Sequence, residues 1–498
     1  MKYQRTSSSK AAPLADAVAR DRRASRPAPS LVVLGQRENG REDKLAERIS
    51  EQLIGDIAAT GWAEGEVLGS EPALIERLGV SRAVFREAVR LLEHQQVARM
   101  RRGPGGGLVI TSATVEAVID PVAVYLFFAR TRVDQVAEAR VALEEIVAGL
   151  ASSRLTEPDV VCLHELADRE RAGQTRSHRE LHDTLASLTK NPALELFVSL
   201  LSRLTQLYLP DASKVGRRVL LASTSAHLGI LDAVIAGDQG RTRHRMRLHL
   251  EAEADYLRRR LKASQPLDAS VLRSLDGRSK KGERVARAIF VEVTESGWPV
   301  GERIGSEAEL MERFGVSRAV LREAVRLLEH HQIAVMRRGP GGGLFVVEPG
   351  VEVVIGALAL LMERRGIRPA DLLELRKAVE DTIIELAIKR LDEERAKGLQ
   401  LALDAERSAE REDFALVAHD LHGVLAGSVD NPVLELVSLV LVRLTRLHLG
   451  SASEVTEPLS DAVTRAHTAI VDAVLARDVE LARRRMSRHL DVLQSFVH

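Results

Sequence analysis

The 498-residue chain carries 71 basic and 71 acidic side chains, so its net charge of zero favours neither a nucleic acid nor a membrane surface as partner. The only cysteine, Cys162, excludes an intrachain disulfide and a cysteine-rich metal knuckle. Aromatic residues make up 3% of the chain, and the abundance of Ala, Leu, Val, Arg and Glu is typical of packed amphipathic helices. Because no apolar run has membrane-spanning length and no signal-peptide core stands at the amino terminus, we expect a cytoplasmic protein without a membrane partner.

One unit occurs twice in the chain. Residues 79–108 read GVSRAVFREAVRLLEHQQVARMRRGPGGGL, and residues 315–344, which lie 236 positions downstream, read GVSRAVLREAVRLLEHHQIAVMRRGPGGGL. The two stretches differ at four positions only, Phe85/Leu321, Gln95/His331, Val97/Ile333 and Arg99/Val335. So close a copy indicates a tandem duplication, and each half of roughly 250 residues is long enough for more than one domain.

Residues 1–40 combine eight Lys and Arg side chains with Ser, Ala and Pro, and contain too few apolar residues to fold alone. We predict a disordered basic arm that has no equivalent in the second half. Two interpretations stay open: the arm adds phosphate or minor-groove contacts to DNA, or it is a solvated tail without a role.

Two helices are predicted after the arm. A first helix is expected over about 43–61 and again over about 281–296, because apolar residues recur there at three- and four-residue steps. Ser70 then caps a short second helix and Gly79 ends it in a left-handed turn, and the second half repeats both signals.

Ser81 and Ser317 are predicted to cap the third helix of each half. In the first copy the inner face holds Val84, Ala88, Leu91 and Leu92, and the outer face holds Arg82, Arg86 and Arg90. Two β-prone stretches follow, 97–100 and 108–110, and a glycine-rich segment joins them as a hairpin. Helix, helix-turn-helix and a two-stranded wing together make a winged helix, which presents its third helix to a DNA groove.

The rest of each half predicts a mainly α fold, namely an antiparallel bundle of six or seven helices with breaks at Pro-containing dipeptides. A polar segment between the halves reads as a linker with a reach of roughly 20 to 25 Å, which lets the halves pair as an intramolecular pseudo-dimer; further homodimerisation stays open. We expect a basic arm (1–40), a winged helix (41–112), a helical effector domain (113–263), a linker (264–279), a second winged helix (280–348) and a second helical effector domain (349–498).

The motif G-V-S-R-x-x-[FL]-R-E-A-V-R-L-L-E, followed by R-R-G-P-G-G-G, resembles the DNA-binding head of the GntR family of bacterial transcriptional regulators. The helical domain behind each head resembles the FadR-type (FCD) effector domain of that family. This resemblance implies that the third helix enters the major groove while the wing tip reaches the minor groove. The family often has Arg in the second helix where Pro72 and Ala308 stand here, so one DNA contact per head is expected to be missing.

The resemblance and the base-reading chemistry of Arg together predict one DNA-binding set in each copy. In the first copy the set is Ser81, Arg82, Ala83, Val84, Arg86, Arg90, Arg102 and Gly103. In the second copy it is Ser317, Arg318, Ala319, Val320, Arg322, Arg326, Arg338 and Gly339. Arg90 and Arg102 are placed for phosphates. The alternative for all these arginines is a solvated helix face.

Histidines recur at matching separations in the two helical domains. The candidate ligands are His178, His182, His227 and His249 in the first copy and His422, His467 and His489 in the second. Imidazoles from separate helices that converge in a bundle hold transition metals, so we expect a divalent metal such as Zn or Ni, against the alternative of core histidines hydrogen-bonded to neighbours. The resemblance implies an Asp-x-x-x-His pair, and His178 and Ala418 stand at the Asp position, so two unequal sites are predicted.

Arg140 and Arg376 match a family arginine and are candidates for pairing with an effector carboxylate, while a structural pair with Glu144 or Glu380 is the alternative. No nucleophile-base pair stands beside the histidines, so we expect no enzyme. The sequence predicts a ligand-responsive regulator, a repressor on a two-fold-symmetric DNA operator, that senses a small carboxylate or fatty-acid-like effector. The alternative is a metal-sensing or architectural DNA-binding protein without a metabolite effector.

Overall fold

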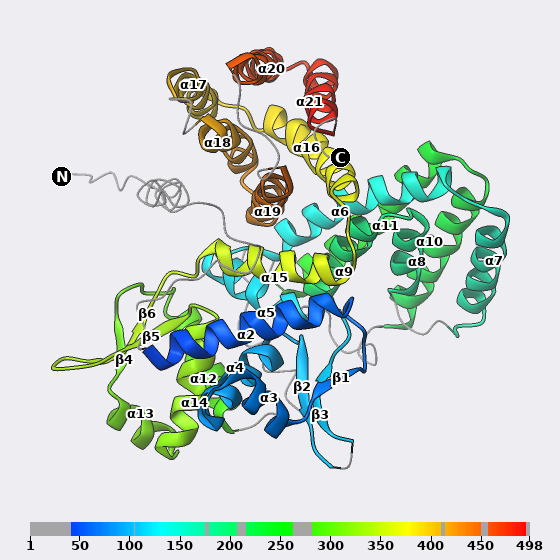
Figure 1. Ribbon diagram of the computed structural model, residues 1–498. Coiled ribbons are helices and arrows are strands. Elements are labelled where there is room, and N and C mark those ends of the chain that lie inside the picture. Colours follow the sequence, from blue (N-terminus) through cyan, green and yellow to red (C-terminus); the bar gives the residue numbers. More distant parts are fainter. Residues whose placement is uncertain are drawn as a thin grey trace, which may run out of the picture.

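The computed structural model describes residues 41–103, 105–174, 179–206, 216–261, 281–409, 414–449 and 457–494. The predicted arm (1–40) and linker (264–279) lie outside the described residues. Two small heads lie together on one side of the molecule, and two helical domains lie on the other (Figure 1). The mainly α fold class is confirmed.

Each head has three helices and a three-stranded sheet. Head 1 contains α2 (Arg41–Ala59), β1 (Val67–Gly69), α3 (Glu71–Leu78), α4 (Arg82–His94), β2 (Ala98–Arg101) and β3 (Gly107–Ile110). Head 2 contains α12 (Lys281–Glu295), β4 (Arg303–Gly305), α13 (Glu307–Phe314), α14 (Arg318–His330), β5 (Ala334–Arg337) and β6 (Gly343–Val346). The predicted winged helix is present in both. The strands β1 and β4, which were not predicted from the sequence, pair antiparallel with the second strand of the wing.

Local capping explains where the head helices begin and end. Ser70 accepts a hydrogen bond from a backbone amide in the first turn of α3, and Gly79 ends that helix at φ 64°, which costs a glycine little. The Ser81 hydroxyl accepts from the amide of Val84 and caps α4. Ser317 occupies the same position before α14, but its side chain makes no capping bond, contrary to the prediction.

Each helical domain has seven helices among the described residues. The first contains α5 (Glu116–Phe128), α6 (Val133–Ser153), α7 (Glu157–Arg171), α8 (Glu180–Leu188), α9 (Pro192–Gln206), α10 (Arg217–Ile235) and α11 (Gln239–Leu261). The second contains α15 (Val351–Arg364), α16 (Pro369–Lys389), α17 (Glu393–Ser408), α18 (Phe414–Gly427), α19 (Pro432–Leu449), α20 (Glu457–Leu475) and α21 (Val479–Gln494). The described Pro-containing breaks are helix starts, as expected for Pro in a first turn.

The two helical domains meet through equivalent contacts. The Nδ2 group of Asn191 donates to Glu374 in the other half over 2.8 Å, and that of Asn431 donates to Glu138 over 2.8 Å. Both asparagines also cap α9 or α19 through their Oδ1 atoms. The same side chain therefore starts a helix and joins the halves, which gives the pseudo-dimer its internal symmetry.

Each head docks on the other half of the chain. Arg364, at the end of α15, donates to the carbonyl oxygen of Gln96 in head 1 over 2.9 Å. Arg130, just after α5, donates to the carbonyl oxygen of Gly297 in head 2 over 2.9 Å. Helices α5 and α15 pack against each other between the heads and the bundles (Figure 1). Each head therefore contacts the helical domain of the other half of the chain, an arrangement that we call crossed docking.

By length and apolarity alone, one helix of the described chain, α10, could cross a membrane. It belongs to the first bundle, where its second half buries His227, Ile230 and Leu231, while its first turns are exposed.

Candidate nucleic-acid interface and candidate metal centres

The outer face of each third helix presents arginines to solvent. The exposed fractions of the Arg82 and Arg86 side chains are 68% and 59%, and those of Arg318 and Arg322 are 65% and 66%. The opposite face of the helix packs on the head core, which fixes the direction of these side chains. The four arginines are therefore accessible to a DNA groove.

A glutamate of the preceding helix holds each arginine pair. The Glu71 carboxylate accepts hydrogen bonds from Arg82 and Arg86 over 2.9 and 3.0 Å, and Glu307 makes the equivalent ion pairs with the second pair of arginines. The hydrogen bond from Arg82 holds the pKa of Glu71 below its usual value. Neither glutamate was predicted from the sequence, although an acidic residue in the first turn of the helix before the exposed arginines indicates such a partner.

Replacing Glu71 and Glu307 with glutamine is expected to weaken the preference for specific DNA over nonspecific DNA. The arginines lose the partner that orients them, so binding to specific DNA becomes weaker. The loss of two negative charges strengthens the attraction to phosphates of any DNA, so nonspecific binding becomes stronger. Binding titrations against specific and random duplexes at several salt concentrations measure the ratio. An unchanged ratio would show that the glutamates do not position the arginines.

Val84 does not lie on the DNA side, contrary to the prediction. Its side chain is 8% exposed and belongs to the core of head 1, because it stands on the face of α4 that packs on α2. Ala83 and Ala319 are exposed, and Val320 is half-buried. These three side chains stay at the predicted interface.

The wing tips are exposed. Arg102 and Arg338 lie at the surface, beside Gly103 and Gly339 with φ angles of 99° and 101°. A residue with a side chain would be strained at such φ values, so the glycines allow the tight tip that a narrow groove requires.

Arg326, a predicted DNA-binding residue, reaches the other head. Its guanidinium lies 2.6 Å from the Glu87 carboxylate, which also pairs with Arg90 over 3.3 Å. The third helices of the two heads, α4 and α14, are thus neighbours, and the ion pair between Arg326 and Glu87 joins the heads. A phosphate that binds Arg326 would compete with Glu87.

Three buried histidines converge in the first helical domain. The Nε2 atom of His249, on α11, lies 3.3 Å from those of His182, on α8, and His227, on α10. The Nδ1 atoms of His182 and His227 face the buried carboxylates of Glu144 and Glu170. With those carboxylates on the Nδ1 side of His182 and His227, the Nε2 atoms of the three rings converge, which is how imidazole ligands are arranged around a metal ion.

The second helical domain repeats the cluster. Ligand atoms of His422, His467 and His489 lie within 4.8 Å of one another, as do those of the first cluster. The Nδ1 atoms of His422 and His467 face the buried carboxylates of Glu380 and Glu406 over 2.9 and 2.7 Å. Three imidazoles, two of them backed by buried carboxylates, fit a divalent transition metal in both domains.

His178, the fourth predicted ligand of the first site, lies outside the described residues. Ala418, at the corresponding position of the second copy, is buried at 4% exposure. Burial, followed by the neighbouring His182 and His227, holds the pKa of His249 well below its usual value, which favours the neutral ring that ligates a cation.

The predicted effector arginines differ in their partners. Arg140 is ion-paired with Glu144 and, over 2.7 Å, with Glu253 on α11. Arg376 has only Glu380, 3.6 Å away, and donates no hydrogen bond to any described residue. The pairs with Glu144 and Glu380 are the structural pairing that the sequence left open.

The surroundings of the two arginines shift their pKa values in opposite directions. Burial opposes the charge of Arg140, but Glu144 and Glu253 raise its pKa, whereas burial lowers the pKa of Arg376. Burial raises the pKa of Glu380 to about 7, against the pull of Arg376. Burial acts the same way on Glu144, yet Arg140 and then His182 hold its pKa below the usual value. The buried Arg140 therefore has carboxylate partners that compensate its charge, whereas the charge of the buried Arg376 is poorly compensated.

Two family models match the chain, each of them twice. The model described as bacterial regulatory proteins, gntR family, matches residues 45–107 and 281–346, and the FCD domain matches residues 135–252 and 371–492. The chain belongs to the GntR family. Since each model matches once in each half, the GntR resemblance and the tandem duplication predicted from the sequence are confirmed.

Relatives of this GntR-family chain align with one half of it. The uncharacterized HTH-type transcriptional regulator YcbG of Bacillus subtilis (strain 168) is 29% identical over 38% of this chain and 78% of its own length. The HTH-type transcriptional repressor NanR of Enterobacter sp. (strain 638) is 24% identical over 47% of this chain and 92% of its own length. A putative L-lactate dehydrogenase operon regulatory protein of Escherichia coli (strain K12) is 26% identical over 43% and 84%. The family identifies a transcriptional regulator that binds DNA and, through FCD domains, small-molecule effectors, rather than an enzyme.

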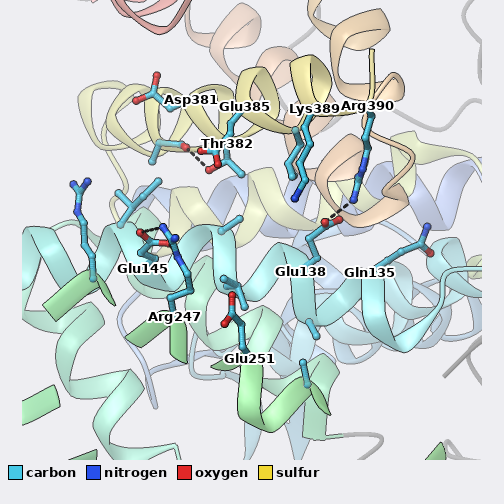
Figure 2. A pocket seen from close by; sticks show the side chains of 18 of the residues that line it. Gln135, Glu138, Glu145, Arg247, Glu251, Asp381, Thr382, Glu385, Lys389 and Arg390 are labelled. Atoms are coloured by element: carbon cyan, nitrogen blue, oxygen red, sulfur yellow. Dashed lines mark hydrogen bonds and ion pairs between the residues drawn. The ribbon is translucent and has the colours of Figure 1, made fainter. Parts of the chain in front are cut away.

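A charged groove of about 990 Å³ separates the two FCD domains of this GntR-family chain. Figure 2 shows its ion pairs: Glu138 with Arg390 across the groove, and Glu145 with Arg247 along one wall, each 2.6 Å. None of the six clustered histidines lines it. The groove therefore lies between the two FCD domains and is not part of either histidine centre.

Proposed function

We propose that this chain represses transcription by occupying a two-fold-symmetric operator with both heads, and that a small carboxylate, bound at a metal-loaded histidine centre, changes the placement of the heads. The convergence of three Nε2 atoms, backed by buried carboxylates, carries the sensing part of this proposal. Nε2 atoms 3.3 Å apart share either a proton or a cation, and a divalent metal would bind all three Nε2 atoms at once.

The DNA part rests on the near-identity of the two recognition helices. Arg82 and Arg86 in head 1 correspond to Arg318 and Arg322 in head 2, and each pair is exposed on the same face. Equal heads read equal half-sites, so we expect an operator with two-fold symmetry. Because one chain carries both heads, the second binding event is intramolecular, which raises occupancy by roughly 10² to 10⁴ without new contacts.

A divalent metal, Zn²⁺ or Ni²⁺, would supply a Lewis-acidic centre with a position open to a carboxylate oxygen. His182, His227 and His249 would hold it in the first domain, and His422, His467 and His489 in the second. Glu144 and Glu380 fix the orientation of one ring in each set, and they connect it to the buried arginines. The name of NanR, a transcriptional repressor, supports repression.

Mapping of chromatin-bound fragments, followed by footprinting with purified protein, tests this function. We expect protection of two inverted half-sites of equal sequence, and release when the cognate carboxylate is added to metal-loaded protein. An asymmetric operator would contradict equal heads. An affinity that responds to neither metal nor any carboxylate would favour an architectural DNA-binding protein instead.

A further inference from the structure

Two buried arginines at corresponding positions of the FCD domains have unequal numbers of carboxylate partners. Arg140 on α6 and Arg376 on α16 are 5% and 1% exposed in their side chains. Each lies one helical turn before a buried glutamate that also contacts a histidine of the candidate metal centre. The guanidinium is thus joined to the histidine cluster through that glutamate in both domains, and a carboxylate that pairs with the guanidinium would take a place beside the cluster.

In the first domain this place is already filled by the chain itself. Glu253, on α11 and 9% exposed, pairs with Arg140 over 2.7 Å in addition to Glu144. Glu253 follows His249 by four residues, and the residue that follows His489 by four is Leu493. The second copy therefore has no carboxyl group at that position of α21.

In the second domain the guanidinium lacks hydrogen bonds. None of its three nitrogens donates to a described residue, and the Glu380 carboxylate at 3.6 Å is too far for a hydrogen bond. A buried guanidinium has five N–H groups to satisfy, and leaving them unpaired is costly. One added carboxylate would give the second domain the same charge balance that Glu253 gives the first.

We propose that Glu253 fills the anion position of the first FCD domain from within the chain, so that only the second FCD domain binds a small carboxylate, with Arg376 as its partner. This inference rests on the proposed function, because it assigns carboxylate sensing to one of the two domains. The first domain is held in the liganded arrangement permanently. A single carboxylate per chain then controls both heads.

The first test needs no ligand and compares the same substitution in both domains. In buffer free of carboxylates, Arg140→Met should lower the melting temperature of the full chain by several degrees, because Glu144 and Glu253 lose their buried partner. Arg376→Met should leave it unchanged or raise it, because a poorly paired buried charge is removed. Equal losses in both variants would overturn the inference.

The second test counts sites in the full chain loaded with Co²⁺, with acetate as the probe. At saturating acetate we expect the visible absorption of half of the bound cobalt to change. Glu253→Leu should extend the change to all of it, and Leu493→Glu should abolish it. Asp255→Leu, an exposed position on the same helix as Glu253, serves as the control and should behave as wild type.

The outcomes separate this inference from the proposed function. A change at all of the cobalt in the wild-type chain would overturn the asymmetry and leave carboxylate sensing intact. No change in the wild type or in Glu253→Leu, with cobalt bound, would overturn carboxylate sensing in both domains. If Co²⁺ does not bind, the metal part of the proposed function fails, and the comparison of the two methionine variants still decides whether Arg376 lacks a partner.

Discussion

Alanine at both Arg82 and Arg318 is expected to lower affinity for the operator by roughly 30-fold to 10⁴-fold. Each bidentate contact between Arg and guanine contributes about 1–3 kcal/mol, and one is lost in each head. Both side chains are about two-thirds exposed and are paired only with a glutamate that orients them, so their removal leaves the fold of the heads intact. Fluorescence anisotropy with a labelled operator at fixed salt measures the loss.

The matched control removes two arginines that lie far from the heads. Arg171 and Arg407 stand on the outer helices α7 and α17 and make exposed pairs with aspartates one turn earlier. Alanine at both positions removes the same total charge and should change operator affinity little. Equal losses in the two double variants would mean that overall charge, rather than base reading at α4 and α14, determines binding.

The second large effect is expected from the histidine centres. Alanine at both His227 and His467 should reduce the metal content of the purified chain from two ions to nearly none, because each site keeps only two imidazoles. A ligand present at 1,000 times its dissociation constant stabilises a protein by about 4 kcal/mol, so metal loss should lower the melting temperature by about 10 °C. Elemental analysis and thermal unfolding with and without chelator measure both quantities.

Exposed histidines provide the control for that experiment. His164 on α7 and His244 on α11 lie at the surface of the first domain, outside the cluster. Alanine at both should leave metal content and the chelator response unchanged. A wild-type chain that contains no metal would remove the metal centre and leave the histidines as buried hydrogen-bonding residues of the bundle core.

The heads were largely predictable from sequence because their signals are local. Helical periodicity, the Ser70 cap and the Gly79 stop lie within a few residues of the elements that they define. The strand β1 was not predicted because three residues that include a glycine show no alternation of apolar and polar side chains. It forms only because it pairs with β3, which lies far along the chain. Val84 was assigned to DNA by its match to the family motif, although the helical period placed it on the inner face of the third helix, where the structure has it.

The histidine centres were predictable only in part. Equal separations in the two copies identified His182, His227 and His249, but not which carboxylates would face them. Glu253 gave no signal, since a glutamate in a helix rich in charged residues is usually solvent-exposed. Its burial depends on how α11 is rotated against α6, which is a property of the packed bundle.

The crossed docking of the heads has a consequence for any fragment of the chain. Phe290 and Trp298 of head 2 form edge-to-face contacts with Phe127 and Phe128 of the first half, 5.4 and 5.7 Å between ring centres. A fragment that contains only one half would expose these aromatic surfaces to water. Each half would then lack contacts that it makes in the full chain, because each head rests on a helical domain of the other half. We therefore expect the duplicated chain to fold and unfold as one unit rather than as two independent regulators.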